Sequence, residues 1–197
     1  MFITFEGIDG SGKSTQLDLL ANYLEQKNKK VIKVREPGGT ILGEKIRDLL
    51  LNFPMNSRSE LLLFLASRAQ LVDEIIKPSL KKGYFVLADR FTDSSIAYQG
   101  GARNLGIDLV ENLNSFATDN ILPNIVFFID VPVNIAITRI LKKDRIEKEG
   151  KNFLEKVRDT YLKISMKKDN FYIIDGNQDV EGVFLQIKNI VDSYLDH

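Results

Sequence analysis

The sequence predicts an α/β fold in which helices flank a five-stranded parallel sheet. Short apolar runs alternate with longer helical patterns along the chain, which is typical of parallel strands joined by right-handed helical crossovers. The runs are apolar at nearly every position, as expected for strands that are covered on both faces. A glycine-rich segment between the first run and the first helical pattern adds a phosphate-binding turn.

The strands are assigned to runs rich in Val, Ile, Phe and Tyr, namely Phe2–Phe5, Lys30–Val34, Tyr84–Ala88, Ile125–Ile129 and Phe171–Ile174. Helical spacing of apolar residues predicts helices over Lys13–Gln26, Glu60–Ile76, Val133–Lys143, Phe153–Lys167 and Val180–Tyr194. We expect Pro78 to end or kink the second of these helices. Loops are predicted at 100–106 and in the charged stretch 142–151. With neither a repeat nor a long linker, we expect residues 1–197 to form one domain.

Composition excludes several kinds of function. The 197 residues contain 27 Lys and Arg and 27 Asp and Glu, so the zero net charge disfavours a nucleic-acid-binding coat. The chain has no cysteine and its one histidine is His197, which argues against thiol chemistry and a histidine base. No apolar run approaches the roughly 20 residues of a membrane span, and the first residues lack signal-peptide features. We therefore expect a cytoplasmic protein that binds neither nucleic acid nor membrane.

The most specific motif is G-x-x-x-x-G-K-[ST], at Gly7–Ser14. It lies between a predicted strand and a predicted helix, where backbone N–H groups and the helix N-terminus can surround phosphate oxygens. Lys13 is placed to reach the terminal phosphates, and the Ser14 hydroxyl is a candidate Mg²⁺ ligand. The alternative is a glycine turn with no ligand. The motif predicts a P-loop NTPase fold that binds ATP through Gly7, Ile8, Asp9, Gly10, Ser11, Gly12, Lys13, Ser14 and Thr15.

This motif does not define the molecule that would accept the phosphoryl group. The chain lacks the Asn-Lys-x-Asp segment with which GTPases recognise guanine, and it is short for a motor or a large ATPase. A small P-loop domain of this kind favours a kinase that acts on a small molecule.

Further segments narrow the family. The chain resembles bacterial thymidylate kinases, of the P-loop nucleoside monophosphate kinase superfamily, along nearly its whole length. The segments that carry the resemblance are Phe5–Thr15, Arg35–Thr40, Phe64–Arg68, Asp89–Gly100 and Asp144–Glu147. The first segment is shared with many families, whereas the second, third and fourth segments occur together in a much narrower range of families.

The resemblance implies a thymine-binding role for Phe64 and Arg68. The two residues are one helical turn apart, and an aromatic ring can stack on a pyrimidine while an arginine donates to a base carbonyl. Periodicity alone favours a core position for Phe64, because it lies within a run of leucines. Arg68 is harder to explain as a core residue, since it interrupts a helix that is otherwise apolar.

The segment after the third predicted strand is expected at the carboxyl edge of the sheet, where ligands of open α/β folds bind. Arg90 can clamp a phosphate bidentately, as the resemblance implies for dTMP, and Asp89 is implied to lie near the metal and phosphates. A structural ion pair between these neighbours is the alternative. The resemblance also implies that Ser95 and Gln99 contact the thymine edge and that Tyr98 packs under the sugar; a polar helix start would explain these residues equally.

The loop that follows the second predicted strand contains Glu36 and is implied to line the acceptor pocket. The resemblance also implies that Arg47, on the next helix, reaches the dTMP phosphate. A solvated helix cation is nearly as good an explanation of Arg47. Asp9 is implied to lie near the acceptor phosphate, the sugar 3′-hydroxyl or Mg²⁺.

Phosphoryl transfer between two anions requires several negative charges to be neutralised. Some thymidylate kinases carry an arginine inside the P-loop, but this chain has Gly10 there. The resemblance implies that a lid at 140–151 supplies the cation, with Arg145 preferred over Lys142 and Lys143. Arg139 is implied to pack on adenine. A charged surface loop is the alternative for the segment.

Together these features predict a transferase that phosphorylates dTMP to dTDP with ATP and Mg²⁺ by direct in-line transfer, for dTTP biosynthesis. The predicted catalytic residues are Lys13, Arg90, Arg145 and Asp9. The alternatives are another small P-loop kinase, for dUMP or a deoxynucleoside, and a P-loop regulatory switch. The resemblance also implies a homodimer packed through long helices.

Overall fold

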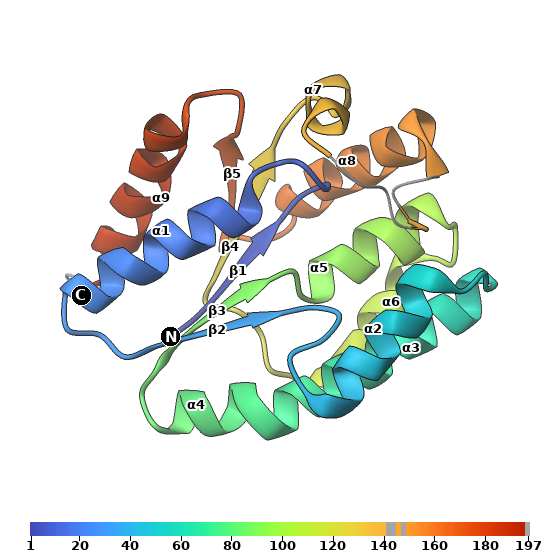
Figure 1. Cartoon of the computed structure of the whole chain (residues 1–197), viewed down its shortest axis with the longest axis horizontal. Coiled ribbons are helices and arrows are strands. Elements are labelled where there is room, and N and C mark those ends of the chain that lie inside the picture. Colours follow the sequence, from blue (N-terminus) through green and yellow to red (C-terminus); the bar gives the residue numbers. More distant parts are fainter. Residues whose placement is uncertain (141–144, 147–148, 196–197) are drawn as a thin grey trace.

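A computed structural model describes residues 1–140, 145–146 and 149–195 and confirms the predicted α/β class. The sheet contains five parallel strands in the order β2-β3-β1-β4-β5 (Figure 1). Their bounds are β1 Phe2–Glu6, β2 Val31–Arg35, β3 Phe85–Asp89, β4 Ile125–Asp130 and β5 Phe171–Asp175.

Every strand ends one residue later than the sequence predicted, and each time the extra residue is charged. The backbone of this residue still pairs with the neighbouring strand, as Arg35 does with Asp89 and Asp130 does with Asp175. An apolar run ends before such a residue, whereas the hydrogen-bonded ladder includes it. A row of charged side chains therefore lines the carboxyl edge of the sheet.

Helices cover both faces of the sheet (Figure 1). The helices are α1 Lys13–Gln26, α2 Ile41–Asn52, α3 Ser57–Leu71, α4 Lys77–Lys81, α5 Thr92–Ser95, α6 Ile107–Thr118, α7 Val133–Thr138, α8 Lys151–Ser165 and α9 Val180–Leu195. Successive side chains of β1 point to opposite faces of the sheet and so pack against different helix layers. Phe5 belongs to the core that includes the buried leucines of α1, whereas Phe2 packs on Phe91 with ring centroids 4.9 Å apart. No helix of the described ranges is both long and apolar enough to cross a membrane.

Pro78 does not end its helix. A π-helical stretch, Val72–Ile76, follows α3 and leads directly into α4, and Pro78 lies in the first turn of α4. The residues before Pro78 are themselves helical, so Pro78 removes one donor from a continuous helix, and the hydrogen bonding changes from π-helical to α-helical directly before it. The chain remains helical to Lys81.

Most other boundaries shift by one to three residues, and two predicted segments differ more clearly from the structure. The helix expected over Val133–Lys143 ends at Thr138, and Lys143 lies outside the described residues. The loop expected at 100–106 begins inside a π-helical stretch, Ile96–Ala102, that continues α5. Gly101 lets this stretch approach α8, since a Cβ on Gly101 would lie 2.2 Å from Oγ1 of Thr160. Glycine at this position therefore reflects close helix packing and not a loop.

Candidate active site

The predicted phosphate-binding motif forms a turn between the end of β1 and the start of α1. Lys13 is the first residue of α1, and its buried Nζ donates to the carbonyl oxygen of Ile8 at 3.0 Å. The same Nζ lies 3.9 Å from Oδ1 of Asp9. Burial and the neighbouring Arg90 lower the pKa of Lys13, while nearby carboxylates oppose this shift. The turn thus holds a cation at the N-terminus of a helix, which is where an anion binds best.

Gly10 is enclosed by another helix. Its φ is +81°, and a Cβ at this position would lie 2.2 Å from the backbone carbonyl oxygen of Ala136 in α7. A side chain here would collide with backbone, so the turn needs glycine at this position. The phosphate site therefore has no side-chain cation at Gly10, and its charge comes from Lys13 and from outside the turn.

The two predicted metal ligands meet. The Ser14 hydroxyl, at the start of α1, donates to Oδ2 of Asp89, at the end of β3, over 2.6 Å. The strand before the phosphate turn, β1, is the neighbour of β3 in the sheet, and Phe5 of β1 pairs with Asp89. The sheet topology therefore brings the two oxygens together.

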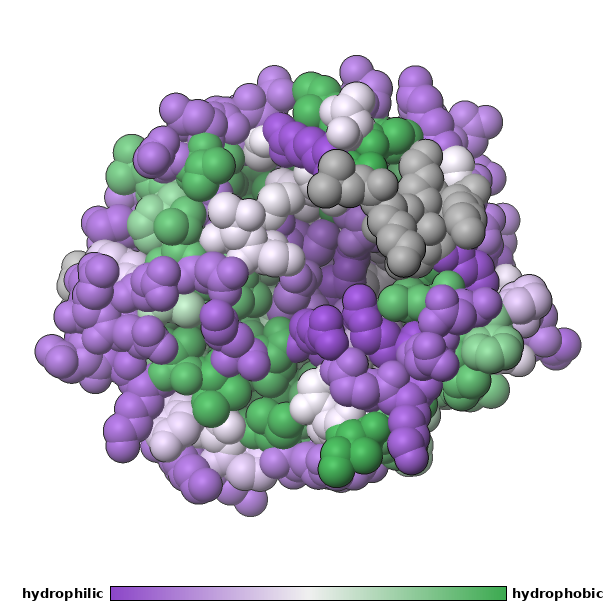
Figure 2. Space-filling view, viewed as in Figure 1, coloured by the Kyte–Doolittle hydropathy of each residue, from purple (hydrophilic) through white to green (hydrophobic). Residues whose placement is uncertain are grey.

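Two cavities open at this edge of the sheet, where Figure 2 shows a largely hydrophilic hollow. The phosphate cavity, of about 750 Å³, is lined by Asp9, Gly10, Gly12, Lys13, Ser14, Thr15, Arg35, Glu36, Arg47, Asp89 and Arg90. The side cavity, of about 510 Å³, is lined by Asp9, Glu36, Pro37, Arg47, Leu51, Phe64, Arg90, Ser94, Ser95, Tyr98, Gln99 and Ile146. Both volumes include space open to solvent. The cavities share four residues, Asp9, Glu36, Arg47 and Arg90, so molecules bound in each would meet there.

Arg90 bridges the phosphate turn and the side cavity. Its Nη1 donates to the carbonyl oxygen of Gly7 at 2.8 Å, and its Nη2 donates to Oδ1 of Asp9 at 2.7 Å. The guanidinium also lies over the Tyr98 ring, 5.2 Å from the centroid. Although burial works to raise the pKa of Asp9, the charges of Arg90 and Lys13 lower it to about 2. Asp9 is therefore an anion at neutral pH, held between two cations.

The loop after β2 is tied to its neighbours by ionic contacts. The backbone N–H of Gly39 donates to Oε1 of Glu44 at 2.8 Å, and Arg35 pairs with Oε2 of the same carboxylate at 2.9 Å. Arg47 donates from Nη1 to the carbonyl oxygen of Pro37 at 3.0 Å. These contacts place Arg47 between the two cavities and not on an open helix surface, and its implied contact with the dTMP phosphate stays a prediction.

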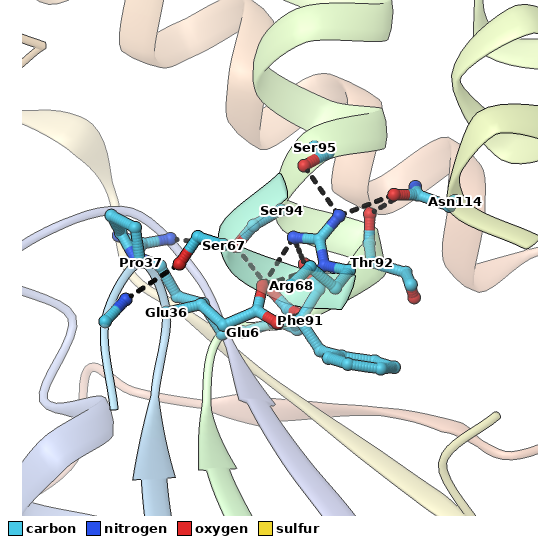
Figure 3. A network of polar contacts seen from close by, with 12 residues as sticks. Glu6, Glu36, Pro37, Ser67, Arg68, Phe91, Thr92, Ser94, Ser95 and Asn114 are labelled. Carbon is cyan, nitrogen blue, oxygen red and sulfur yellow. Dashed lines mark hydrogen bonds and ion pairs between the residues drawn. The ribbon is translucent and has the colours of Figure 1, made fainter. Parts of the chain in front are cut away.

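Arg68 lies at the centre of a buried network (Figure 3). Its five N–H groups donate to Oε2 of Glu36 twice, at 2.8 and 2.5 Å, to Ser95 Oγ at 3.0 Å, to Asn114 Oδ1 at 2.5 Å and to the carbonyl oxygen of Phe91 at 2.9 Å. Burial raises the pKa of Glu36, and the Arg68 charge opposes that shift.

This network places Arg68 differently from its expected role. The residue does not line the side cavity, and protein atoms already accept all of its donors. In this structure Arg68 supports Glu36 and Ser95, which do line the cavity, and its implied contact with the base stays a prediction.

Phe64, Ser95, Tyr98 and Gln99 all lie on the side cavity. Phe64 is half-buried: it packs against the core, as periodicity favoured, and it also lines the cavity, while its implied stacking on thymine stays a prediction. Tyr98 lies beneath Arg90 and packs edge-on against Phe153 of α8, with centroids 6.1 Å apart. An aromatic wall and two polar side chains are what a planar ligand with a polar edge requires.

The lid cations are only partly described. Lys142 and Lys143 lie outside the described residues. Arg145 is not beside the phosphate turn. Its Nη2 pairs with Oε2 of Glu60 at 2.7 Å, and its Nε donates to the carbonyl oxygen of Leu50 at 2.9 Å. Arg139 follows α7 and donates to the carbonyl oxygen of Gly10 at 3.4 Å, next to the phosphate cavity.

Sequence reasoning missed several buried residues behind the cavities. Glu6, at the end of β1, accepts from the backbone N–H of Phe91 at 2.8 Å, Ser94 Oγ at 2.6 Å and Tyr161 OH at 2.8 Å. Burial, reinforced by the charge of Asp93, raises the pKa of Glu6 to about 7. The signal was a carboxylate that ends an apolar strand directly before the phosphate turn.

Glu60 and Asn114 were also missed. Glu60 precedes Phe64 by one helical turn and Arg68 by two, so helical periodicity could have placed it on the same face of α3. Asn114 lies on α6, and its contact with Arg68 joins residues 46 positions apart. No local pattern indicates such a contact.

Comparisons with known proteins agree on one family. The family profile described as thymidylate kinase matches residues 5–187. The chain is 73% identical to a thymidylate kinase of Thermosipho melanesiensis over the full length of both chains, and 67% identical to one of Thermosipho africanus over 99% of both. Among solved structures, a thymidylate kinase from Ehrlichia chaffeensis superposes with a TM-score of 0.81 at 40% identity, covering 98% of each chain.

Proposed function

Since the chain belongs to the thymidylate kinase family, it is a kinase that phosphorylates dTMP, and we propose how its own residues perform this reaction. ATP occupies the phosphate cavity, with Arg139 beside the adenine. dTMP occupies the side cavity, with its thymine against Phe64 and its phosphate pointing toward Arg90 and Arg47. We also propose one kinase domain over residues 1–197 with a lid at 140–151, of which residues 140, 145–146 and 149–151 are among those described.

One observation carries this arrangement. The phosphate cavity and the side cavity meet at Asp9, Glu36, Arg47 and Arg90, so the donor phosphates and the acceptor phosphate come together between two acidic residues and two arginines. A regulatory switch would have no use for a second, aromatic-walled cavity that shares its residues with the phosphate site.

The chemistry then consists of positioning and charge neutralisation. Lys13 holds the terminal phosphates of ATP at the start of α1, and Arg90 holds the acceptor phosphate. The acceptor oxygen is already ionised at neutral pH, so no general base is required. Asp9 is ionised as well and keeps the guanidinium of Arg90 oriented through the 2.7 Å contact. Direct in-line transfer gives dTDP with no covalent enzyme intermediate.

The pair formed by Ser14 and Asp89 fits Mg²⁺. Both side chains offer hard oxygen atoms, they face the phosphate cavity, and they lie 2.6 Å apart. The described residues hold no group of three or more metal-ligating His, Cys, Asp or Glu side chains, which suits an ion that takes its remaining ligands from water and substrate phosphates. When bound, Mg²⁺ would neutralise charge on the phosphates of ATP. We further propose that the enzyme is a cytoplasmic homodimer, in keeping with exposed apolar side chains on α3 and α6.

A panel of nucleotides tests the substrate assignment. ADP release is measured with ATP, Mg²⁺ and one acceptor at a time, taken from dTMP, dUMP, dCMP, thymidine and deoxyuridine. We expect the highest kcat/KM with dTMP. A better result with dUMP or a nucleoside would assign the chain to another small kinase, and slow hydrolysis that no acceptor accelerates would favour a regulatory switch.

A further inference from the structure

We propose that Glu60 is a positioning residue that fixes which hydrogen-bonding atoms the side cavity offers to the edge of a base. Glu60 lies in the first turn of α3, behind the cavity wall, and would not itself touch dTMP. The inference rests on the proposed function, because it takes the side cavity as the place where the acceptor base binds.

Glu60 is buried and ionised. Its side chain is 1% exposed, and both carboxylate oxygens are surrounded by donors. Oε1 accepts from Gln99 Nε2 at 2.8 Å and from Arg103 Nε at 3.2 Å. Oε2 accepts from Arg103 Nη2 at 3.1 Å and from Arg145 Nη2 at 2.7 Å. Although burial works to raise the pKa of Glu60, these hydrogen bonds and charges lower it, so the group is a carboxylate and can only accept.

Glu60 fixes the orientation of the Gln99 side-chain amide. A carboxylate can pair only with the NH₂ end of an amide, so the contact with Glu60 turns Nε2 of Gln99 away from the ligand. Gln99 lines the side cavity, and within the described part of the chain no hydrogen bond uses its Oε1. The atom that Gln99 offers to a ligand is therefore an acceptor.

Ser95 lies one helical turn before Gln99 and lines the same cavity. Its Oγ accepts from Arg68 Nη1 at 3.0 Å, which leaves the hydroxyl hydrogen to donate. The cavity thus presents an acceptor and a donor side by side. Thymine offers the complementary pair, a donor at N3–H and an acceptor at O4, whereas cytosine has an acceptor at N3 and a donor at its 4-amino group.

Glu60→Gln should reverse this polarity. Two guanidinium N–H groups reach the Oε2 position, at 3.1 and 2.7 Å, whereas one, Arg103 Nε, reaches the Oε1 position at 3.2 Å. The amide oxygen is therefore favoured at the Oε2 position, and the new NH₂ group at the Oε1 position gives up the longer Arg103 contact and donates toward residue 99. Gln99 would then turn its oxygen toward residue 60 and its NH₂ group into the cavity. The acceptor offered to N3–H of thymine becomes a donor that suits N3 of cytosine.

The experiment measures kcat and KM for dTMP and dCMP in the wild type, Glu60→Gln, Gln99→Met and the double variant. For Glu60→Gln we expect the ratio of kcat/KM for dTMP over dCMP to fall at least ~10-fold, mainly through KM, because hydrogen-bond mismatch changes binding of the base more than chemistry at the phosphate. In the Gln99→Met background the same substitution should leave the ratio unchanged within ~2-fold, since the residue through which Glu60 acts is gone.

Glu74→Gln provides the matched control, because it makes the same change at an exposed carboxylate, and it should leave the ratio at the wild-type value. Thermal unfolding of each variant separates lost stability from lost selectivity, because destabilisation lowers the activity with both nucleotides equally. An unchanged ratio in Glu60→Gln, or an equal change in both backgrounds, would overturn the proposal. A wild type that does not phosphorylate dTMP would instead overturn the proposed function.

Discussion

At the scale of single residues, Arg90 carries the most unusual backbone. Five described non-glycine residues have positive φ, and the other four are asparagine or aspartate, which adopt this conformation most easily. Arg90 adopts φ +72° directly after β3, and its contacts with Gly7, Asp9, Ser94 and Tyr98 hold it there. Strain of about 1–3 kcal/mol in such a residue persists only where its surroundings fix the conformation. Here the strained backbone conformation places the guanidinium where the two cavities meet.

The sequence predicts that Arg145 is the catalytic cation of the lid, and a substitution at this residue tests that prediction. Replacing it with alanine should lower kcat at least ~10²-fold and change the affinity for ATP little, if its charge is used only in the transition state. Steady-state kinetics with both substrates measures this. A variant with normal kcat and a raised KM for dTMP would show that Arg145 acts where the structure places it, against Glu60, and would move the catalytic role to Lys142 or Lys143.

Glu6 should make stability depend on pH near neutrality. Its pKa of about 7 in the folded state lies above the ordinary value of 4.5, so the native protein binds this proton more tightly than the unfolded chain does. The contribution to stability is complete below about pH 4.5 and is lost as the pH rises through 7. Urea unfolding between pH 5 and 8 should show a decline that is shallower in Glu6→Gln. Equal slopes in both proteins would contradict the assignment.

At the scale of elements, capping residues and helix irregularities shape the site. Thr40 and Asn56 cap α2 and α3 through side-chain oxygens, which sets where the helices carrying Arg47, Phe64 and Arg68 begin. Two π-helical stretches follow in this half of the chain, and the second carries Tyr98 and Gln99. Such stretches occur often at functional sites, and here one places both side chains on the cavity wall.

The cap of α2 offers a direct test. The Thr40 hydroxyl accepts from the backbone N–H of Gly43 at 2.9 Å. Thr40→Val keeps the shape of the side chain and removes the acceptor, so we expect a loss of about 1 kcal/mol in the free energy of unfolding. Urea denaturation measures the loss, and Thr40→Ser should retain most of the stability. If valine and serine behave alike, the hydroxyl contributes nothing as a cap.

At the scale of the whole molecule, the sheet order decides where the site lies. β1 has β3 on one side and β4 on the other, so the carboxyl ends of β1 and β3 bring the phosphate turn, Asp89 and Arg90 together. This is the edge at which open α/β folds bind ligands. Away from it, α3 and α6 pack against each other and carry exposed apolar side chains, Leu62, Leu109 and Phe116.

Phe116 is the best test of the proposed homodimer, because it is 88% exposed and lies two helical turns from Leu109 on α6. We expect Phe116→Asp to convert the dimer to monomers, since a buried unpaired charge at an apolar interface is strongly unfavourable. Sedimentation equilibrium gives the mass. Leu185→Asp, a similar change at an exposed position of α9, should stay dimeric. A monomeric wild type would rule out the homodimer.

The sequence by itself determined the alternation of strands and helices, the phosphate turn with Lys13 and Ser14, and the edge of the sheet at which Arg90 lies. These features depend on residues close together in the chain, where periodicity and motif spacing apply. Tertiary structure decided the partners of each charge. It joined Arg68 to Asn114, Arg145 to Glu60 and Glu6 to Tyr161, and so assigned Arg68 to support the cavity wall. Such contacts depend on how distant helices pack over the sheet, and a buried charge is satisfied by whatever that packing brings within hydrogen-bonding distance.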